Sequence, residues 1–143
     1  MKKRNTALFI DGENISARYA DIIMKIAKRQ GKIDSAKVYG RQCDTYTREW
    51  SEKAKFRSEL KDIRLYGRPE KDKVDRKIQK DALNTSKEAK NVDIYIFATS
   101  DQGYCPTIIK LRELGKRVIV IGEKKAPDCL RDACSEFYEV YCD

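Results

Sequence analysis

Hydrophobic residues in this chain gather in short runs that alternate with longer amphipathic segments. A short apolar run between turn residues is typical of a strand buried on both faces. Such runs predict strands at residues 6–10, 36–40, 63–66, 92–98, 117–121 and 137–141. The segments between them carry apolar residues at helical spacing. They predict helices at residues 15–30, 47–60, 73–89, 104–114 and 127–133.

The strict alternation of strands and helices predicts the fold class. Parallel strands joined by right-handed crossovers place helices on both faces of one sheet. We therefore expect a single α/β domain over residues 1–143, a Rossmann-like three-layer α/β/α sandwich around a mainly parallel sheet of five or six strands. A strand order of 3-2-1-4-5 makes the first and fourth strands neighbours. Ligands then bind beyond the carboxyl ends of the strands, where the order reverses.

Composition narrows the chemistry. The 31 Lys and Arg outnumber the 23 Asp and Glu, and the net charge of +8 favours a polyanionic partner. The absence of histidine excludes Ser-His-Asp and Cys-His catalysis and His-ligated zinc. The five cysteines include no Cys-x-x-Cys pair, and no apolar run suits a signal peptide or a membrane span. We therefore expect reduced thiols, a cytoplasmic location and no membrane partner.

Three acids fall where the predicted sheet ends. Asp11 and Asp101 each follow a strongly apolar strand, and Asp75 opens the charged helix that leaves the same edge. Carboxylates that converge there repel one another unless a cation neutralises them, and oxygen-only ligands favour Mg²⁺ or Mn²⁺. Each acid also has a structural alternative: Asp101 suits a helix N-cap, and Asp75 suits a surface pair with Lys71 or Gln79.

A basic patch surrounds Asp75. Its members are Lys71, Lys73, Arg76 and Lys77, with Lys80 beside them. Beside a carboxylate cluster, such cations can hold the phosphates on either side of a scissile bond. The alternative is a solvated helix face with local ion pairs. Four tyrosines could stack on unpaired bases, although core packing is the competing explanation. They are Tyr39, Tyr46, Tyr66 and Tyr104.

Several segments resemble, in order, the motifs of NYN domains, the PIN-like nuclease group that includes the LabA-like proteins. Residues 9–15 (FIDGENI) resemble the opening signature. Residues 73–75 (KVD) and 80–82 (KDA) resemble the middle motif, and residues 98–104 (ATSDQGY) resemble the third. Two later segments resemble the rest of the domain, at residues 111–118 and 130–137.

The resemblance implies a PIN-like fold and RNA cleavage that depends on Mg²⁺ or Mn²⁺. The implied catalytic and metal-binding acids are Asp11, Asp75 and Asp101. The implied supporting residues are Asn14, Asp81 and Ser100. The chain departs from the third motif at Gly103, where the family has a second acid.

We therefore expect a ribonuclease that acts on single-stranded RNA and, as the resemblance implies, leaves a 5′-phosphate and a 3′-hydroxyl. Two alternatives stay open. One is a non-catalytic RNA-binding module in which Gly103 marks a decayed site. The other is a nucleotide-binding or phosphoryl-transfer domain that uses the same crevice. The sequence also leaves a homodimer open.

Overall fold

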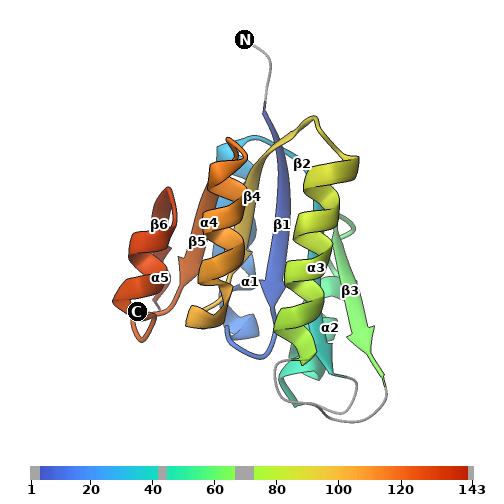
Figure 1. Ribbon diagram of the computed structural model, residues 1–143. Coiled ribbons are helices and arrows are strands. Elements are labelled where there is room, and N and C mark those ends of the chain that lie inside the picture. The colour runs from blue at the N-terminus through green and yellow to red at the C-terminus, as the bar shows by residue number, and fades with distance from the viewer. Residues whose placement is uncertain (1–3, 42–44, 67–72, 142–143) are drawn as a thin grey trace.

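The computed structural model describes residues 4–41, 45–66 and 73–141. Over these residues the sheet has six strands, all parallel, in the order β3-β2-β1-β4-β5-β6 (Figure 1). The strands are β1 (Asn5–Asp11), β2 (Lys32–Arg41), β3 (Leu60–Leu65), β4 (Val92–Ala98), β5 (Arg117–Gly122) and β6 (Glu136–Glu139). The predicted order of the first five strands is confirmed, and the last strand pairs with β5.

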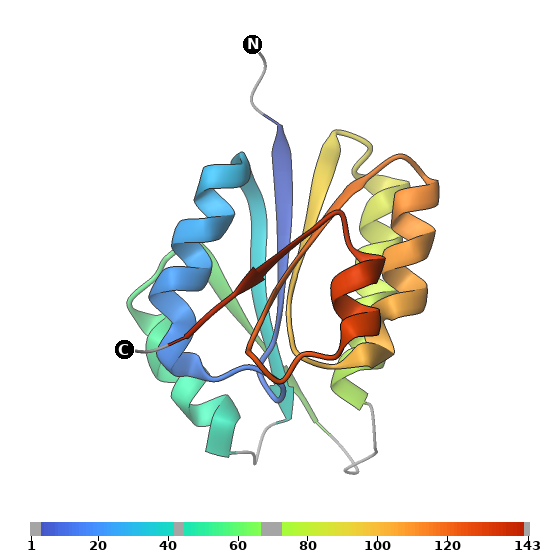
Figure 2. The same cartoon turned by 90° about the vertical axis from the view of Figure 1, so that its left-hand side faces the viewer.

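Helices cover both faces of this sheet. The α-helices are α1 (Ala20–Gln30), α2 (Thr45–Lys55), α3 (Lys73–Glu88), α4 (Cys105–Glu113) and α5 (Asp128–Ala133). Short 3₁₀ turns, η1 (Ala17–Tyr19) and η2 (Gln102–Tyr104), precede α1 and α4. Figure 2 shows the layers edge-on, with α1 and α2 on one face and α3, α4 and α5 on the other. The predicted three-layer sandwich is confirmed.

Several predicted boundaries were wrong by three to five residues: α1 begins at Ala20 rather than residue 15, and β3 begins at Leu60 rather than residue 63. The helix predicted to run to residue 60 ends at Lys55, because Leu60 is buried and pairs in the sheet with Ala36. The second strand begins at Lys32 rather than residue 36. Gly31 lies so close to the carbonyl oxygen of Arg4 that a Cβ would be 2.3 Å from it. The chain therefore joins the sheet as soon as α1 ends.

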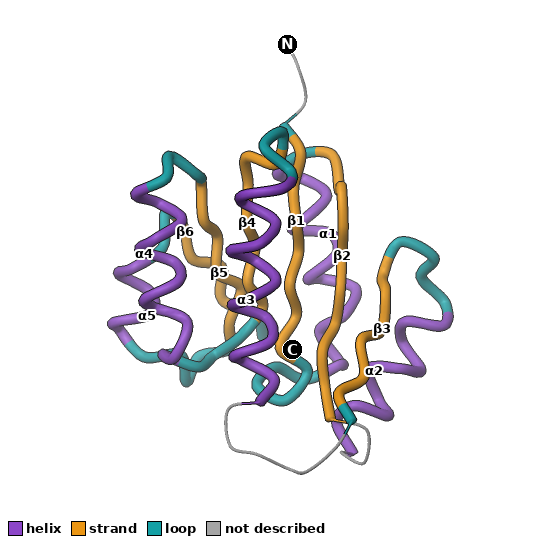
Figure 3. The backbone as a smooth tube through the Cα atoms, turned by 45° about the vertical axis from the view of Figure 1, so that its right-hand side comes forward, coloured by secondary structure: helices purple, strands orange, loops and turns teal. Residues whose placement is uncertain are grey.

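The core has one layer on each face of the sheet. Leu8 and Ile10 of β1 face the layer that contains α1 and α2. Ala7 and Phe9 face the opposite layer, where the ring of Phe9 stacks on Phe97 with centroids 5.5 Å apart. Because side chains alternate along a strand, the next residue on the Phe9 side is Asp11. The side chain of Asp11 therefore lies on the α3 and α4 face of the sheet. Figure 3 shows the course of the central strand β1, at whose carboxyl end this residue lies.

The helices of the described residues are all too short or too polar to cross a membrane.

Candidate active site

Asp11 is a buried carboxylate held by four hydrogen bonds. Its Oδ2 accepts from Asn14 Nδ2 at 2.8 Å, from Tyr104 OH at 3.0 Å and from Thr99 Oγ1 at 3.1 Å. Its Oδ1 accepts from the Glu13 backbone N–H at 3.1 Å. Burial raises the pKa of Asp11, and these hydrogen bonds act against that rise because they favour the charged form.

These bonds join two connections of the chain, one after β1 and one between β4 and α4. Asn14 lies in the turn after β1, Thr99 follows β4, and Tyr104 closes η2 before α4. Asn14 also accepts a hydrogen bond on its backbone oxygen from Ser100 N at 3.2 Å. Asp11 and Asn14 therefore fix the turn after β1 against the turn after β4, which is the point where the strand order reverses.

Asp75 and Asp101 meet at Gly103. A Cβ placed on Gly103 would be 3.0 Å from Asp75 Oδ2 and 3.6 Å from each carboxylate oxygen of Asp101. Asp101 Oδ1 accepts the Gly103 backbone N–H at 3.1 Å, so Asp101 is the N-cap of η2 as its structural alternative predicted. Asp75 is only 8% exposed, which contradicts a solvated surface pair. Two carboxylates thus lie against the position that a side chain at residue 103 would occupy.

All three acids surround Tyr104. Burial raises the pKa of the Tyr104 phenol well above its ordinary value. The charge of Asp11 and the hydrogen bond to it add to this rise, followed by the charges of Asp75 and Asp101. A tyrosine that lies in the field of three carboxylates keeps its proton and acts as a hydrogen-bond donor. The three acids, which the sequence predicted to come close together, therefore lie around Gly103 and Tyr104.

The donor set has the chemistry of a hard-cation site, but it is not a closed cage. Carboxylate oxygens are the ligands that Mg²⁺ and Mn²⁺ prefer. Within residues 4–41, 45–66 and 73–141, no three acidic or cysteine side chains are close enough together to hold an ion as they stand. Asp11 Oδ2 already accepts three hydrogen bonds. The side-chain oxygens nearest a Cβ at Gly103 belong to Asp75 and Asp101.

The other supporting residues have different partners. Asp81 lies nearly two helical turns beyond Asp75 on α3. It accepts a hydrogen bond from Tyr39 OH at 2.7 Å and pairs with Lys77 at 3.1 Å. Ser100 Oγ accepts from the Glu123 backbone N–H at 3.0 Å. Asp81 therefore lies apart from the acids around Gly103, and Ser100 ties the turn after β4 to the turn after β5.

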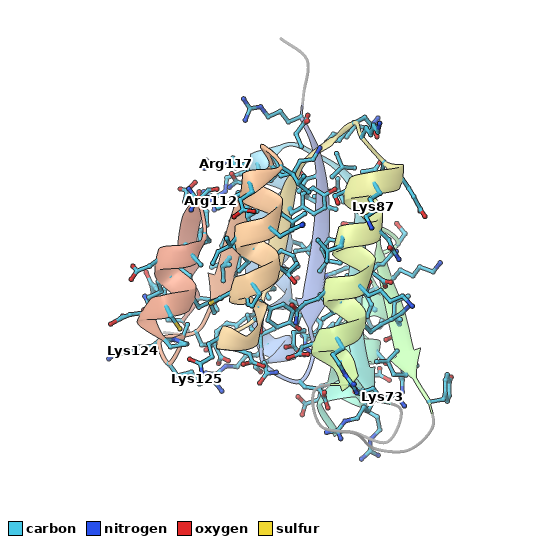
Figure 4. The ribbon with its side chains drawn as sticks, viewed as in Figure 1. Lys73, Lys87, Arg112, Arg117, Lys124 and Lys125 are labelled. Atoms are coloured by element: carbon cyan, nitrogen blue, oxygen red, sulfur yellow. The ribbon has the colours of Figure 1, made fainter. Side chains whose placement is uncertain are left out.

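The predicted basic patch is divided between several roles. Lys73 Nζ donates to the backbone oxygen of Tyr66 at 2.5 Å, and Lys77 is paired with Asp81. Arg76 is exposed on the first turn of α3. Lys71 lies outside the described residues. The ion pair of Lys77 bears out the alternative of a solvated helix face for that residue, while Lys73 stays at the edge of the site (Figure 4).

The structure adds two cations that the sequence analysis did not select. Lys124 and Lys125 are exposed and follow β5, directly after Glu123. In Figure 4 they lie on the opposite side of the carboxyl edge from Lys73. Their signal in the sequence was the Lys-Lys pair immediately after an apolar strand, the same position that selected Asp11 and Asp101.

The tyrosines mostly follow the packing alternative. Tyr39 and Tyr104 are fully buried in the α3 and α4 layer of the core. Tyr66 is 63% exposed, and its backbone oxygen is the partner of Lys73. The side chain of Tyr46 lies outside the described part of the structure. Among the tyrosines named above whose side chains are described, Tyr66 alone has a ring open to an incoming base.

The cysteines in the described residues are all free thiols. Cys129 is exposed on α5, Cys105 is partly buried at the start of α4, and Cys134 is buried after α5. Burial and the neighbouring Cys129 raise the pKa of Cys105 to about 11. This thiol is therefore protonated at neutral pH and is a poor nucleophile.

Comparison with known structures supports the fold. One similar structure is that of a protein of unknown function from Vibrio parahaemolyticus RIMD 2210633. The two chains are 19% identical with a TM-score of 0.77, and the match covers 97% of this chain and 94% of the other. Identity this low shows a shared fold and nothing finer. None of the curated proteins matches the chain.

Family comparison agrees with the motifs and with the geometry of the site. The NYN domain, a nuclease-like fold, matches residues 5–141, which is nearly the whole sequence. The match includes β1 with Asp11, the start of α3 with Asp75, and the turn after β4 with Asp101. The chain therefore belongs to the NYN domain family.

Proposed function

We propose that this protein is a divalent-metal-dependent ribonuclease whose site lies at the carboxyl edge of β1 and β4. The observation that supports it best is the meeting of Asp75 and Asp101 at Gly103, with Asp11 buried behind Tyr104. Three carboxylates of a basic protein gather at the one edge where a sheet of this order binds ligands. A cation relieves their mutual repulsion.

Mg²⁺ or Mn²⁺ fits this oxygen-rich site. Asp75 and Asp101 would hold the ion with the oxygens that border Gly103, and Asp11 would add the third negative charge. A bound ion would supply Lewis acidity and an activated water for attack on phosphorus, so no protein histidine is needed as a base. A 5′-phosphate and a 3′-hydroxyl would result.

The surrounding residues would bind and orient the RNA. Lys73 would neutralise a phosphate on the α3 side, and Lys124 would do so on the β5 side. Tyr66 lies next to Lys73 with an exposed ring, and such a ring stacks on an unpaired base. This pairing of a cation with an aromatic face favours single-stranded RNA. Arg76 would contribute a further phosphate contact from the first turn of α3.

Asn14 and Tyr104 would be positioning residues in this proposal. Both donate to Asp11 Oδ2, which keeps the carboxylate ionised and oriented although it is buried. Ser100 would position the turn after β5. Asp81, which pairs with Lys77 and Tyr39, would stabilise α3 against β2 and take no part in the reaction.

A second candidate function is RNA binding without cleavage. It is favoured by the four hydrogen bonds that Asp11 accepts and by the lack of a third acid at Gly103. A cytoplasmic location and a homodimer remain predictions that accompany either function.

The decisive experiment is a cleavage assay with end-labelled single-stranded RNA in Mg²⁺ or Mn²⁺, with a chelator control. Asp101→Asn should abolish cleavage while the thermal unfolding curve stays close to that of the wild type. The matched control is Asp93→Asn, an exposed aspartate of β4, which should cleave normally. Metal-independent cleavage, or full activity in Asp101→Asn, would remove this assignment. A gel shift without cleavage would favour the second candidate.

A further inference from the structure

A small polar cavity adjoins the acids on the side away from α3. Its volume is about 260 Å³. It lies between the turn after β1 and the turn after β5, and its lining residues are Glu13, Asn14, Ile15, Ser16, Glu123 and Lys125. Asn14 is shared with the site itself, because its side chain donates to Asp11. The cavity is therefore adjacent to the proposed reaction centre.

The walls of the cavity are fixed to the turn that carries Asp101. Ser100 N donates to the backbone oxygen of Asn14 at 3.2 Å, and the Glu123 backbone N–H donates to Ser100 Oγ at 3.0 Å. One residue of the turn after β4 thus holds both sides of the cavity. Any group bound there has a set position relative to Asp101, which a specificity pocket requires.

The charges in the cavity define what it can bind. The side chains of Glu13 and Glu123 are 19% and 20% exposed, so both carboxylates are partly sheltered from water. Glu13 is paired with Arg41 at 2.6 Å, whereas the nearest cation to Glu123 is Lys125 at 4.0 Å. Two carboxylates repel a phosphate group, and an ammonium among them disfavours a metal ion. The remaining match is a neutral group that presents N–H donors to a carboxylate and an oxygen acceptor to a lysine.

We propose that this cavity binds the base of one nucleotide of the RNA and that it prefers guanine. The proposal rests on the ribonuclease or RNA-binding function proposed above. The Watson–Crick edge of guanine carries the N1–H and 2-amino donors beside the O6 acceptor. Glu123 would accept from the donors and Lys125 would donate to O6. Unpaired bases of RNA are read on this edge.

The other bases match this set of charges less well. Uracil presents one N–H between two oxygens, so a carboxylate meets acceptors on both sides of its only donor. Adenine and cytosine present an amino group beside an acceptor nitrogen, which leaves one oxygen of the carboxylate without a donor. A site built to accept an N–H strongly rejects analogues that lack it, because its own polar group is then left unpaired.

The test measures binding of mononucleotides to the full chain, in a chelator, by isothermal titration. The probes are guanosine, inosine, adenosine, cytidine and uridine 5′-monophosphates. Guanosine monophosphate should bind about tenfold more tightly than uridine monophosphate, and inosine monophosphate, which lacks the 2-amino group, should lie between them. Equal affinities for all five, or no binding of any, overturn the proposal.

Two variants and a control sharpen the result. Glu123→Gln should remove most of the preference for guanosine over inosine, because an amide cannot accept both N–H groups. Lys125→Met should weaken both of these nucleotides, since both carry O6. The control Glu113→Gln, an exposed glutamate of α4, should bind like the wild type. An unchanged preference in Glu123→Gln overturns the assignment of that residue and with it the proposal.

The result separates this proposal from the function on which it rests. Base-selective binding without RNA cleavage supports the cavity and counts against the nuclease. Metal-dependent cleavage with the same rate at every base, together with equal mononucleotide affinities, supports the nuclease and overturns the cavity.

Discussion

Gly103→Asp tests whether the acids at this edge form an incomplete metal site. In the present chain, a Cβ on Gly103 would lie 3.0 Å from Asp75 Oδ2 and 3.6 Å from both oxygens of Asp101. Gly103 has no positive φ, so an aspartate meets no backbone strain there. A Cβ at this position requires the Asp75 side chain to move by a few tenths of an ångström. The main effect of the change is therefore electrostatic.

The size of that effect follows from the charges. Two unit charges about 4 Å apart repel by about 1 kcal/mol in water and by about 4 kcal/mol at an effective dielectric constant of 20. The new carboxylate faces both Asp75 and Asp101 at this kind of distance. Without metal, we expect the free energy of unfolding to fall by roughly 2 kcal/mol or more. For a domain of this size, that corresponds to a drop of roughly 6 °C in Tm.

With Mn²⁺, the sign of the change should reverse. A ligand at about 100 times its Kd stabilises the folded state by about 2.7 kcal/mol. The variant, with a third carboxylate at the ion, should reach that condition at a lower Mn²⁺ concentration than the wild type. We also expect faster RNA cleavage, because a more fully occupied ion would supply more of the activated water.

The assay is thermal unfolding across a Mn²⁺ titration, with Gly103→Ala as the matched control. Alanine adds the same Cβ without the charge, so it isolates the steric part. The reasoning is refuted if Gly103→Asp loses no more stability than Gly103→Ala in a chelator, or if Mn²⁺ fails to restore it. In that event the acids do not surround an ion site, and RNA binding without cleavage becomes the better function.

Three further predictions concern neighbouring residues. Asp11→Asn should lower the free energy of unfolding by about 1–3 kcal/mol in urea titrations, because its amide N–H₂ must face at least one of four hydrogen-bond donors. Burial raises the pKa of Asp11 in the folded protein above 3.8. The contribution of Asp11 to the free energy of unfolding should therefore be largest in acid and should fall as the pH rises through the pKa of Asp11 in the folded protein. Asp11→Asn should lack this pH dependence. Lys73→Ala should reduce the slope of log K against log salt by about 0.7 for single-stranded RNA, whereas Lys87→Ala, at the far end of α3 in Figure 4, should leave the slope unchanged.

The fold could be predicted because local pattern and long-range pairing agree. The central strands contain apolar runs, such as residues 94–98 of β4, and a right-handed crossover then leaves few arrangements. The errors occurred where neighbours in space decide the boundary. The extended start of β2 depends on Lys32 N donating to the Arg4 oxygen at 2.8 Å, a contact that no local pattern reveals. Leu60 belongs to β3 through its pairing with β2.

The acids of the candidate site could be selected from the sequence, but the residues that form hydrogen bonds with them could not. Asp11, Asp75 and Asp101 could be selected because strand ends and helix starts meet at one edge of a parallel sheet. Tyr104 was assigned to packing or base stacking, and its hydroxyl group instead binds Asp11 at 3.0 Å. The hydrogen bonds that Ser100 makes with Asn14 and Glu123 join residues far apart in sequence. Such contacts depend on tertiary structure, and the sequence carries no periodic signal for them.

The acids of this cluster differ in their surroundings, and this difference separates a structural role from a role in the proposed function. Asp11 is 1% exposed and is bound by residues from two loops, so its first effect is to hold those loops together. Asp75 and Asp101 lie beside Gly103, and in the proposed function they are the carboxylates that hold the ion. Loss of the Asp11 charge must then disturb folding and function together. Loss of the Asp101 charge should disturb function alone, because the backbone hydrogen bond to Gly103 survives in an asparagine. This difference between the acids of two motifs follows from where each lies in the fold, and the motif matches alone assign them the same role.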